Sequence, residues 1–345
     1  MNKAPKVSII IPVKQLSYYL LHENIPELAK QTYKNIEVLV LPNEHSQYDL
    51  SLLKEYKWLR IIPTGKVTRP AQKRDIGVQN AKGEIIAFLD DDAYPDQHWI
   101  ENAVRIFNTK KVTVVCGPGI LPKKTTIWEN IFNQVLTSAV GAGGYTYRFI
   151  QQSARYVDDY PSMNFLISKK TFKKLGGFNS DYWPGEDSKL CNDIIEKEKG
   201  TIYYDPAVLV YHHRRADLKG YLKQHANYGF HRGAFFAHGD KNSRSLAYLI
   251  PTLFVLYLLA LTIFLAMYFL RIALVGIPLT IALLPLCLYG ILLAYLIVRS
   301  VFNALNPIIA LGSALVLVLT HVVYGIMFIK GFSKGINKNK SIYAR

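Results

Sequence analysis

Charged residues are almost absent from the last third of this chain. Leu246–Leu270 has none over 25 positions, Ile272–Val298 has none over 27, and Asn306–Ile329 carries only His321. As helices rising 1.5 Å per residue, such runs reach about 36 Å, whereas the hydrocarbon core of a bilayer is roughly 30 Å thick. Three of them in succession argue against a globular core. The sequence therefore predicts about three transmembrane segments, 246–270, 272–298 and 306–329.

Cysteine and acidic residues are also scarce. The 3 cysteines, Cys116, Cys191 and Cys287, have neither zinc nor redox spacing, so we interpret them as small buried residues. Acidic residues number 25 against 41 basic ones, a net charge of +16. Such a balance is typical of nucleic-acid binding, but no zinc-finger, RNP or recognition-helix pattern accompanies it. We therefore expect no nucleic-acid partner, and instead an anionic membrane surface and phosphate-bearing substrates.

The membrane segments divide the chain. We expect a domain over 1–215, a basic interfacial helix region over 216–245, the membrane part over 246–330 and a basic tail over 331–345. A strand follows the first six residues directly, which leaves no room for a signal peptide and predicts a cytoplasmic domain on a multi-pass protein of the cell membrane. Three crossings would place the tail opposite that domain, although its lysines favour the cytoplasmic side. One segment could be re-entrant, and Pro278 and Pro285 favour the second.

Apolar and helical patterns alternate through the first domain. This order predicts an α/β fold with a parallel, doubly wound sheet. The expected strands are 7–11, 36–41, 60–63, 85–89, 112–116, 163–167 and 201–211, and the expected helices are 20–32, 70–81, 96–108, 127–140, 169–175, 188–197 and 218–237.

The strand 85–89 ends in three carboxylates, Asp90, Asp91 and Asp92. Ligands of open α/β sheets collect at the carboxyl ends of strands, and adjacent carboxylates repel unless a cation lies among them. Mg²⁺ or Mn²⁺ prefers such oxygen ligands. A simple helix N-cap is the alternative reading. The triplet thus indicates a metal site or a cap.

Further motifs lie in a characteristic order. Lys73-Arg-Asp-Ile-Gly precedes the triplet, and Gly176-Gly-Phe and Gly185-Glu-Asp follow it. From Val7 to Gly233 the chain resembles the family 2 glycosyltransferases, which have the GT-A nucleotide-diphospho-sugar transferase fold, and especially members with trailing transmembrane helices. The resemblance implies transfer of a sugar from a nucleotide donor with inversion, a divalent metal (Mn²⁺ or Mg²⁺), and a role in cell-surface polysaccharide or glycolipid synthesis.

The resemblance also implies site residues. Asp92 and Asp90 match the Asp-x-Asp metal motif, and Asp187, with Glu186 as the alternative, matches the catalytic base. His213 is ranked before His212 as the histidine near the metal. The residues expected on the donor side are Pro12, Asn43, Glu44, Arg74, Asp75, Asp90 and Asp91; those expected on the phosphate and acceptor side are His212, Arg214, Gln224 and Arg232. Helix capping, a solvated helix face and a membrane-lying basic helix are the structural alternatives for these charges.

One position departs from the family pattern. Most members end the second strand with an aspartate that holds the nucleobase, and here Pro42 stands there, followed by Asn43 and Glu44. The loose Gln224…Arg232 spacing also lacks the tryptophan of processive members. We therefore expect a membrane-anchored transferase acting on a lipid-linked or membrane-proximal glycan. The alternatives are a catalytically silent nucleotide-sugar-binding scaffold and a processive polysaccharide synthase.

Overall fold

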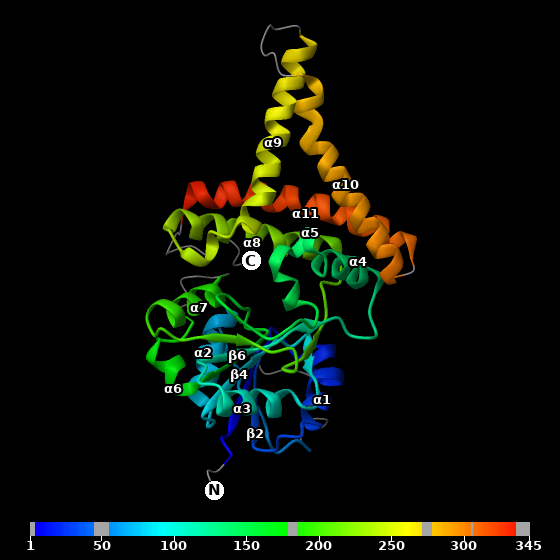
Figure 1. Cartoon of the computed structure of the whole chain (residues 1–345). Coiled ribbons are helices and arrows are strands. Elements are labelled where there is room, and N and C mark those ends of the chain that lie inside the picture. The colour runs from blue at the N-terminus through cyan, green and yellow to red at the C-terminus, as the bar shows by residue number, and fades with distance from the viewer. Residues whose placement is uncertain (1–3, 45–54, 179–184, 271–277, 305, 336–345) are drawn as a thin grey trace. The chain divides into compact units, whose positions relative to one another are not determined.

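The computed structural model describes residues 4–44, 55–178, 185–270, 278–304 and 306–335 (Figure 1). Contacts between residues divide the described chain into two compact units. The first holds residues 4–122 and 147–213, and the second holds residues 123–146 and 214–335. Residues 123–146 lie inside the predicted 1–215 domain but pack with the second unit. Each unit is described by itself below.

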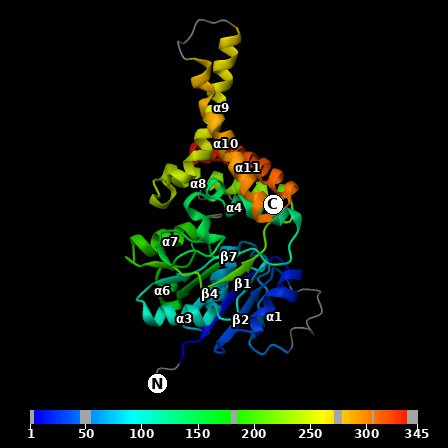
Figure 2. The same cartoon turned by 45° about the vertical axis from the view of Figure 1, so that its right-hand side comes forward.

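The first unit contains an 8-stranded sheet in the order β3-β2-β1-β4-β9-β6-β10-β8. Its strands are β1 (Val7–Pro12), β2 (Ile36–Leu41), β3 (Leu59–Ile61), β4 (Ile85–Leu89), β6 (Val114–Cys116), β8 (Arg155–Val157), β9 (Asn164–Ser168) and β10 (Ile202–Tyr204). Figure 2 shows β1, β2 and β4 side by side, and these strands are parallel. β9 is antiparallel to β4 and β6, and β8 is antiparallel to β10. The sheet is thus mostly, not wholly, parallel.

A second sheet has three strands in the order β5-β11-β7. These are β5 (Ala93–Pro95), β7 (Gly119–Ile120) and β11 (Val210–His212). The prediction of one strand over 201–211 is wrong, because β10 ends at Tyr204 and β11, in the other sheet, begins at Val210. Asp205 and Pro206 stand between them, where proline cannot donate a ladder hydrogen bond. This change of sheet brings the end of β11 beside β5, directly after the acid triplet.

Helices flank the first unit's strands. They are η1 (Leu20–Asn24), α1 (Ile25–Ala29), α2 (Pro70–Asn80), α3 (Trp99–Thr109), α6 (Lys169–Lys174) and α7 (Glu186–Glu196), and η3 (Gly143–Arg148) runs in from the second unit. All five residues of β4 are buried, as its continuous apolar run predicts. Trp99, Ile100 and Ala103 of α3 are buried in the same core.

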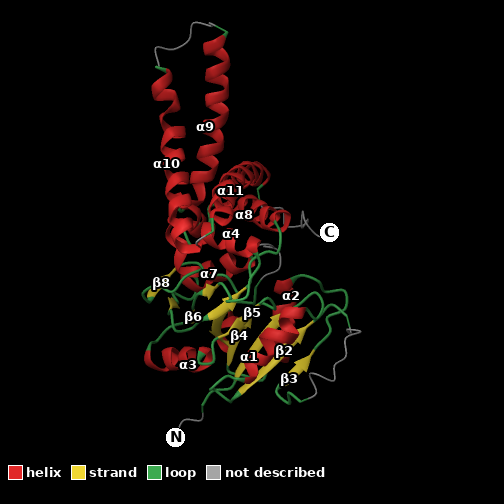
Figure 3. Cartoon of the chain, turned by 90° about the vertical axis from the view of Figure 1, so that its right-hand side faces the viewer, coloured by secondary structure: helices red, strands yellow, loops and turns green. Residues whose placement is uncertain are grey.

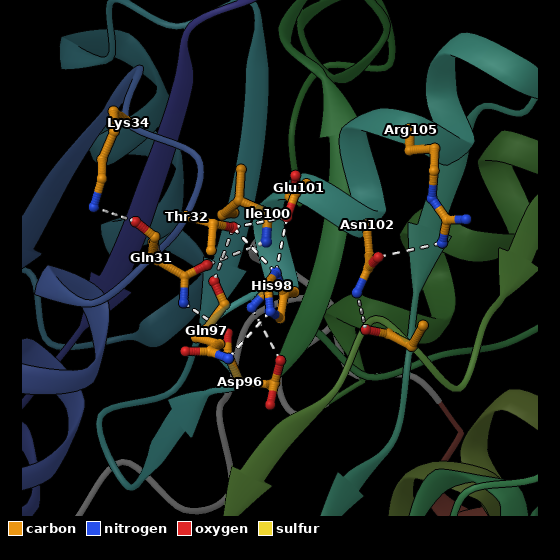
Figure 4. A network of polar contacts seen from close by, with 11 residues as sticks. Gln31, Thr32, Lys34, Asp96, Gln97, His98, Ile100, Glu101, Asn102 and Arg105 are labelled. Atoms are coloured by element: carbon orange, nitrogen blue, oxygen red, sulfur yellow. Dashed lines mark hydrogen bonds and ion pairs between the residues drawn. The ribbon is translucent and has the colours of Figure 1, made fainter.

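A polar network fixes the start of α3 to the loop after α1 (Figure 4). Gln31 donates from Nε2 to the Asp96 carbonyl over 2.7 Å, and its Oε1 accepts from the Ile100 N–H over 3.2 Å. Thr32 donates from its hydroxyl to Glu101 over 2.8 Å. Gln31 therefore holds the chain both just before α3, at Asp96, and in its first turn, at Ile100.

The double-glycine turn is held by Asp75 of α2. The Phe178 N–H donates to Asp75 Oδ1 over 3.1 Å. Gly177 has φ +80°, and a Cβ there would lie 2.5 Å from the same oxygen. Glycine is required at this position for its conformation and for the close approach of the carboxylate.

The described part of the second unit is entirely helical, as the colouring of Figure 3 shows. It contains α4 (Ile127–Leu136), α5 (Ala139–Ala142), α8 (Leu218–His238), η4 (Lys241–Ser243), α9 (Leu246–Phe269), α10 (Leu279–Ala304) and α11 (Pro307–Lys334). By length and composition, α9, α10 and α11 could each cross a membrane. Residues 271–277, the start of the predicted second segment, lie outside the described residues.

Glycines let α8 and α11 touch backbone to backbone. A Cβ on Gly233 of α8 would lie 2.0 Å from the Phe328 carbonyl oxygen.

We predict that Gly233→Ala lowers the melting temperature of the purified chain, because an atom forced against backbone costs about 1–3 kcal/mol. Gly290→Ala is the matched control, since nothing lies within 4 Å of its Cβ position and alanine favours a helix. Equal melting temperatures for Gly233→Ala and the unaltered chain would contradict this packing.

Asp75 also predicts a pH dependence. Burial raises the pKa of Asp75 to about 6. The folded chain therefore holds a proton that the unfolded chain has lost, and this contribution to stability disappears as pH rises from about 4 to 6. Asp75→Asn keeps an oxygen for the Phe178 N–H and does not titrate. We predict that the variant gains stability relative to the unaltered chain between pH 4 and pH 7 in denaturant unfolding. A difference that is constant with pH would contradict the assignment.

Candidate active site

Three potential metal ligands meet at the end of β4. Asp90, Asp92 and His212 each offer one ligand atom, and these atoms lie within 4.8 Å of one another. His212 ends β11, and its Nε2 lies 3.1 Å from Asp92 Oδ1. Two carboxylates and an imidazole are a donor set that Mn²⁺ accepts, and Mg²⁺ is compatible with the two carboxylates. The cluster therefore fits a divalent cation.

The backbone that carries the acids is held from two directions. Asn24, fully buried at the end of η1, donates to the carbonyls of Asp90 over 3.2 Å and Ala93 over 2.5 Å. On the other side the His213 N–H donates to the Asp92 carbonyl over 3.0 Å. The position of the carboxylates thus depends on η1 and β11, which lie far from them in the sequence.

Arg74 of α2 joins this cluster to a second acidic group. Its Nη2 lies 2.8 Å from Asp90 Oδ1, and its Nη1 lies 3.7 Å from Glu186 Oε1. The side chain is 6% exposed, and its Nε has no hydrogen-bond partner among the described residues. Burial lowers the pKa of Arg74, but Asp90, Asp187 and Glu186 together raise it above its ordinary value. The guanidinium is therefore a fixed positive charge among three carboxylates.

Glu186 and Asp187 open α7. Burial raises the pKa of both, and the repulsion between the neighbouring carboxylates adds to that of Glu186. Asp187 is hydrogen-bonded to Ser162. Its Oδ1 is buried and has no hydrogen-bond partner in the part of the chain that the structure describes. Ser188, the next residue, donates to Asp159 over 3.0 Å and fixes this end of the helix. An acceptor oxygen of Asp187 is thus left available for a proton.

A buried lysine organises the carboxyl ends of β1 and β2. Lys73 Nζ donates to the carbonyls of Val13 and Leu41, the latter over 3.1 Å, and to Asn43 Oδ1 over 2.5 Å. Burial lowers the pKa of Lys73 to about 8, and the nearby charge of Asp91 opposes that shift. Because an ammonium only donates, it fixes the amide of Asn43 with its oxygen toward Lys73 and its NH₂ group away from it.

The other predicted residues lie in varied surroundings. Asp91 is hydrogen-bonded to Ser17. Burial and the charge of Asp92 raise the pKa of Asp91 to about 7. His213 lies 2.9 Å from Glu23 and stacks on Tyr19, so the structure brings His212, not His213, to the acid cluster. Pro12 is buried at the end of β1, Glu44 is exposed, and Asp75 holds the Phe178 turn. Arg214, Gln224 and Arg232 belong to the helical unit, where they contact Asn133, Tyr228 and Ser243 respectively.

Sequence reasoning missed two asparagines that position this site. Asn24 is one of them. Asn164 of β9 donates to the carbonyls of Gly117 and Val208, both over 2.7 Å, and accepts from Trp99 Nε1 over 2.8 Å. The sequence marks Asn164 only as a polar residue at the start of the apolar run 164–167. That feature belongs to no catalytic motif.

Comparisons with known proteins agree with this architecture. Residues 8–176 match the family model described as Glycosyl transferase family 2. A dolichyl N-acetyl-alpha-D-glucosaminyl phosphate 3-beta-D-2,3-diacetamido-2,3-dideoxy-beta-D-glucuronosyltransferase of Methanococcus voltae is 23% identical over 74% of this chain and 81% of its own. The minor teichoic acid biosynthesis protein GgaB of Bacillus subtilis is 24% identical over 56% of this chain, which spans only 21% of that relative.

A solved structure shows the same fold. The mannosyltransferase PcManGT of Pyrobaculum calidifontis, in complex with GDP-Man and Mn²⁺, superposes with a TM-score of 0.57 at 17% identity. The superposition covers 96% of this chain and 88% of that one. The superposition shows the GT-A fold, and the family model together with the curated relatives identifies the chain as a glycosyltransferase whose residues 8–176 form a family 2 domain.

Proposed function

We propose that the chain is a membrane-anchored, metal-dependent, inverting glycosyltransferase. It takes a sugar from a nucleoside-diphosphate donor and transfers it to a lipid-linked or membrane-proximal glycan. The observation that carries this proposal is the Arg74 guanidinium between Asp90 of the acid–histidine cluster and Glu186 of the acidic pair. It sets a diphosphate-binding edge and a proton acceptor side by side in one unit.

Asp90, Asp92 and His212 are the residues that would hold the cation. A bound Mn²⁺ or Mg²⁺ supplies positive charge against the diphosphate, which leaves with developing negative charge. A buried arginine adds to this effect, since charge-assisted hydrogen bonds to phosphate are strong in a poorly hydrated site. The unpartnered Nε–H of Arg74 is a donor of this kind.

Asp187 is the proposed base. Glu186 is occupied by the Arg74 contact and by the Gly185 N–H over 3.0 Å, whereas Asp187 Oδ1 has no partner among the described residues. Asp187 accepts the proton of the acceptor hydroxyl while the hydroxyl oxygen forms its bond to the anomeric carbon. The bond from that carbon to the diphosphate oxygen breaks, and the diphosphate takes the electron pair. A single displacement of this kind inverts the anomeric configuration.

The nucleobase is proposed to lie at the ends of β1 and β2. Neighbouring strands are about 4.8 Å apart, so the end of β2 is about 10 Å from the end of β4, a span that a nucleoside diphosphate bridges. Asn43 presents its NH₂ group there because Lys73 holds its oxygen. We infer that the Asn43 NH₂ group donates a hydrogen bond to the nucleobase. The aspartate found at the end of this strand in most of the family would instead accept a hydrogen bond from the base.

The membrane helices suggest the acceptor. A chain anchored in a bilayer by its candidate membrane helices suits a substrate with a lipid anchor, and the Methanococcus relative is named for a dolichyl-phosphate-linked sugar. The lysines and arginines that flank the helices favour the cytoplasmic side of the cell membrane for the first unit.

The first test is hydrolysis of nucleotide sugars by the detergent-purified chain. We expect one donor to be turned over selectively, with Mn²⁺ or Mg²⁺ required and activity lost in chelator. Asp92→Asn should lower turnover by about 10²-fold or more, since it weakens charge stabilisation of the leaving group. Asp158→Asn, at an exposed carboxylate of the same unit, is the control and should leave turnover unchanged. Turnover of no donor, or equal turnover in Asp92→Asn, would refute the proposal.

The base assignment makes a separate prediction. With the donor found above, Asp187→Asn should lower the rate of transfer by about 10²–10⁴-fold and leave donor binding nearly unchanged. Glu186→Gln should retain more activity. It should also move the low-pH limb of kcat/KM to lower pH, because losing a neighbouring carboxylate lowers the pKa of Asp187. If Glu186→Gln lost more activity than Asp187→Asn, the two roles would be exchanged.

A further inference from the structure

The three candidate membrane helices have different surroundings within the helical unit. Of their most apolar stretches, 17% is buried in α9 and 6% in α10, against 50% in α11. α9 and α10 pack side by side, with Tyr257 donating to the Ala282 carbonyl over 2.9 Å and Phe254 stacking on Tyr289. α9 and α10 therefore form a hairpin whose outer surface lacks protein cover in the described chain.

α11 is bound to a polar helix instead. Its backbone touches that of α8 at three glycines: a Cβ would lie 2.4 Å from Tyr324 O at Gly229, 2.0 Å from Phe328 O at Gly233 and 1.8 Å from Phe230 O at Gly331. α8 also carries Lys219 and Lys223, both exposed. Each such charge costs about 2.5–3.5 kcal/mol at the centre of a membrane helix. α11 cannot cross the bilayer in this packing without drawing α8 in with it.

The arrangement of the helices agrees. Figures 1 and 3 both show α11 lying across the foot of the α9–α10 hairpin, beside α8. Gly325 meets the Pro251 carbonyl near the start of α9, and Ser313 hydrogen-bonds Ser300 near the end of α10 over 3.2 Å. α11 also reaches further along the hairpin, because His321 hydrogen-bonds Tyr289 of α10 over 3.0 Å and lies edge-on to Phe254 of α9. Its contacts therefore cover the first turns of α9 and the second half of α10, and the outer part of the hairpin extends beyond them.

The exposed side of α11 is an apolar stripe. The residues of the stripe recur at helical spacing and are 39–64% exposed: Ile308, Leu311, Leu315, Ile326 and Ile329. A helix that is buried against protein on one side and apolar on the other requires a further apolar cover. The hairpin packs on α11 at Gly325, His321 and Ser313, so the lipid that surrounds the hairpin is the apolar cover that this stripe would meet.

Lengths and charges fit two crossings. α10 runs 20 residues from Leu279 to Val298 before Arg299, which at 1.5 Å per residue is about 30 Å, the thickness of the hydrocarbon core. Arg299 itself donates to the carbonyl of Thr137, the C-cap of α4, over 3.1 Å. Lys241 and Arg244 precede the hairpin, and Lys330 and Lys334 end α11. Two crossings place all of these charges on one side, as the positive-inside rule requires, and three do not.

We propose that only α9 and α10 cross the membrane, and that α11 lies in the membrane interface with its apolar stripe against lipid and its other side on α8. The sequence favoured the second segment as the broken one, whereas these contacts single out the third. The proposal is independent of the transfer chemistry. It places Lys330 and Lys334, at the end of α11, on the same side of the membrane as Lys241 and Arg244.

The depth of α11 can be measured directly. In a Cys287→Ala background, in which Cys116 and Cys191 are buried, a fluorescent label is placed on Leu315→Cys of α11 or Leu288→Cys of α10. The full chain is reconstituted in phosphatidylcholine vesicles brominated near the headgroup or deep in the acyl chain. Leu315 and Leu288 are 60% and 54% exposed, so the pair is matched. We expect shallow bromines to quench the Leu315 label more strongly and deep bromines to quench the Leu288 label more strongly.

Two results would overturn the proposal. Equal preference of both labels for deep bromines would show that α11 spans the bilayer. Quenching of the Leu288 label alone would show that another protein surface, such as a second copy of the chain, covers the stripe.

The side of the membrane gives a second readout in case a labelled variant folds poorly. With an impermeant maleimide on sealed vesicles of one orientation, Ser333→Cys should react from the same side as Ser153→Cys of the first unit. Phe269→Cys, at the end of α9, should react from the opposite side. Reaction of Ser333→Cys together with Phe269→Cys would require three crossings.

Discussion

The site depends on one buried cation. Arg74 is held by α2 between Asp90, at the end of β4, and the Glu186–Asp187 pair at the start of α7. Without it, these three carboxylates would gather in a poorly hydrated region, and removing one partner of a buried ion pair typically costs about 3–5 kcal/mol. The guanidinium therefore links the element that would hold the diphosphate to the element that would take the proton. Its two-sided fork is suited to this bridging in a way that an ammonium is not.

The helical unit is governed by a similar constraint on charge. α8 carries lysines that are costly in hydrocarbon, and its glycines bring it into backbone contact with α11. By length and composition alone, α11 is a candidate third membrane span. These two properties do not show which side of a helix is already packed against protein. Packing against a polar helix decides where an apolar helix can lie. The same contact holds the end of α11, with Lys330 and Lys334, against α8.

Local patterns predicted the apolar strands of the large sheet but not β5, β7 or β8, and tertiary contacts decided the site. β2 and β4 have the predicted bounds because each is a mostly apolar run, interrupted only by Glu37 in β2, and ends at a proline or a charge. The order of the strands could not be predicted from local patterns. β9 pairs antiparallel with β4, and residues 201–211 divide between two sheets. His212 rather than His213 reaches the acids because β11 ends at His212 and pairs there with Ala93, a register that no local pattern encodes. Lys73 was read with its neighbours as part of a charged helix, yet it is buried because three carbonyl oxygens surround it.

The pH dependence of kcat/KM in Arg74→Lys tests this account most directly. A lysine keeps the charge but reaches one carboxylate instead of two. The account predicts a lower kcat/KM, with its low-pH limb moved to higher pH because the Glu186–Asp187 pair loses the cation that favours its ionised form. An unchanged rate and an unmoved limb would show that Arg74 does not connect the two acidic groups during transfer, and would contradict the account.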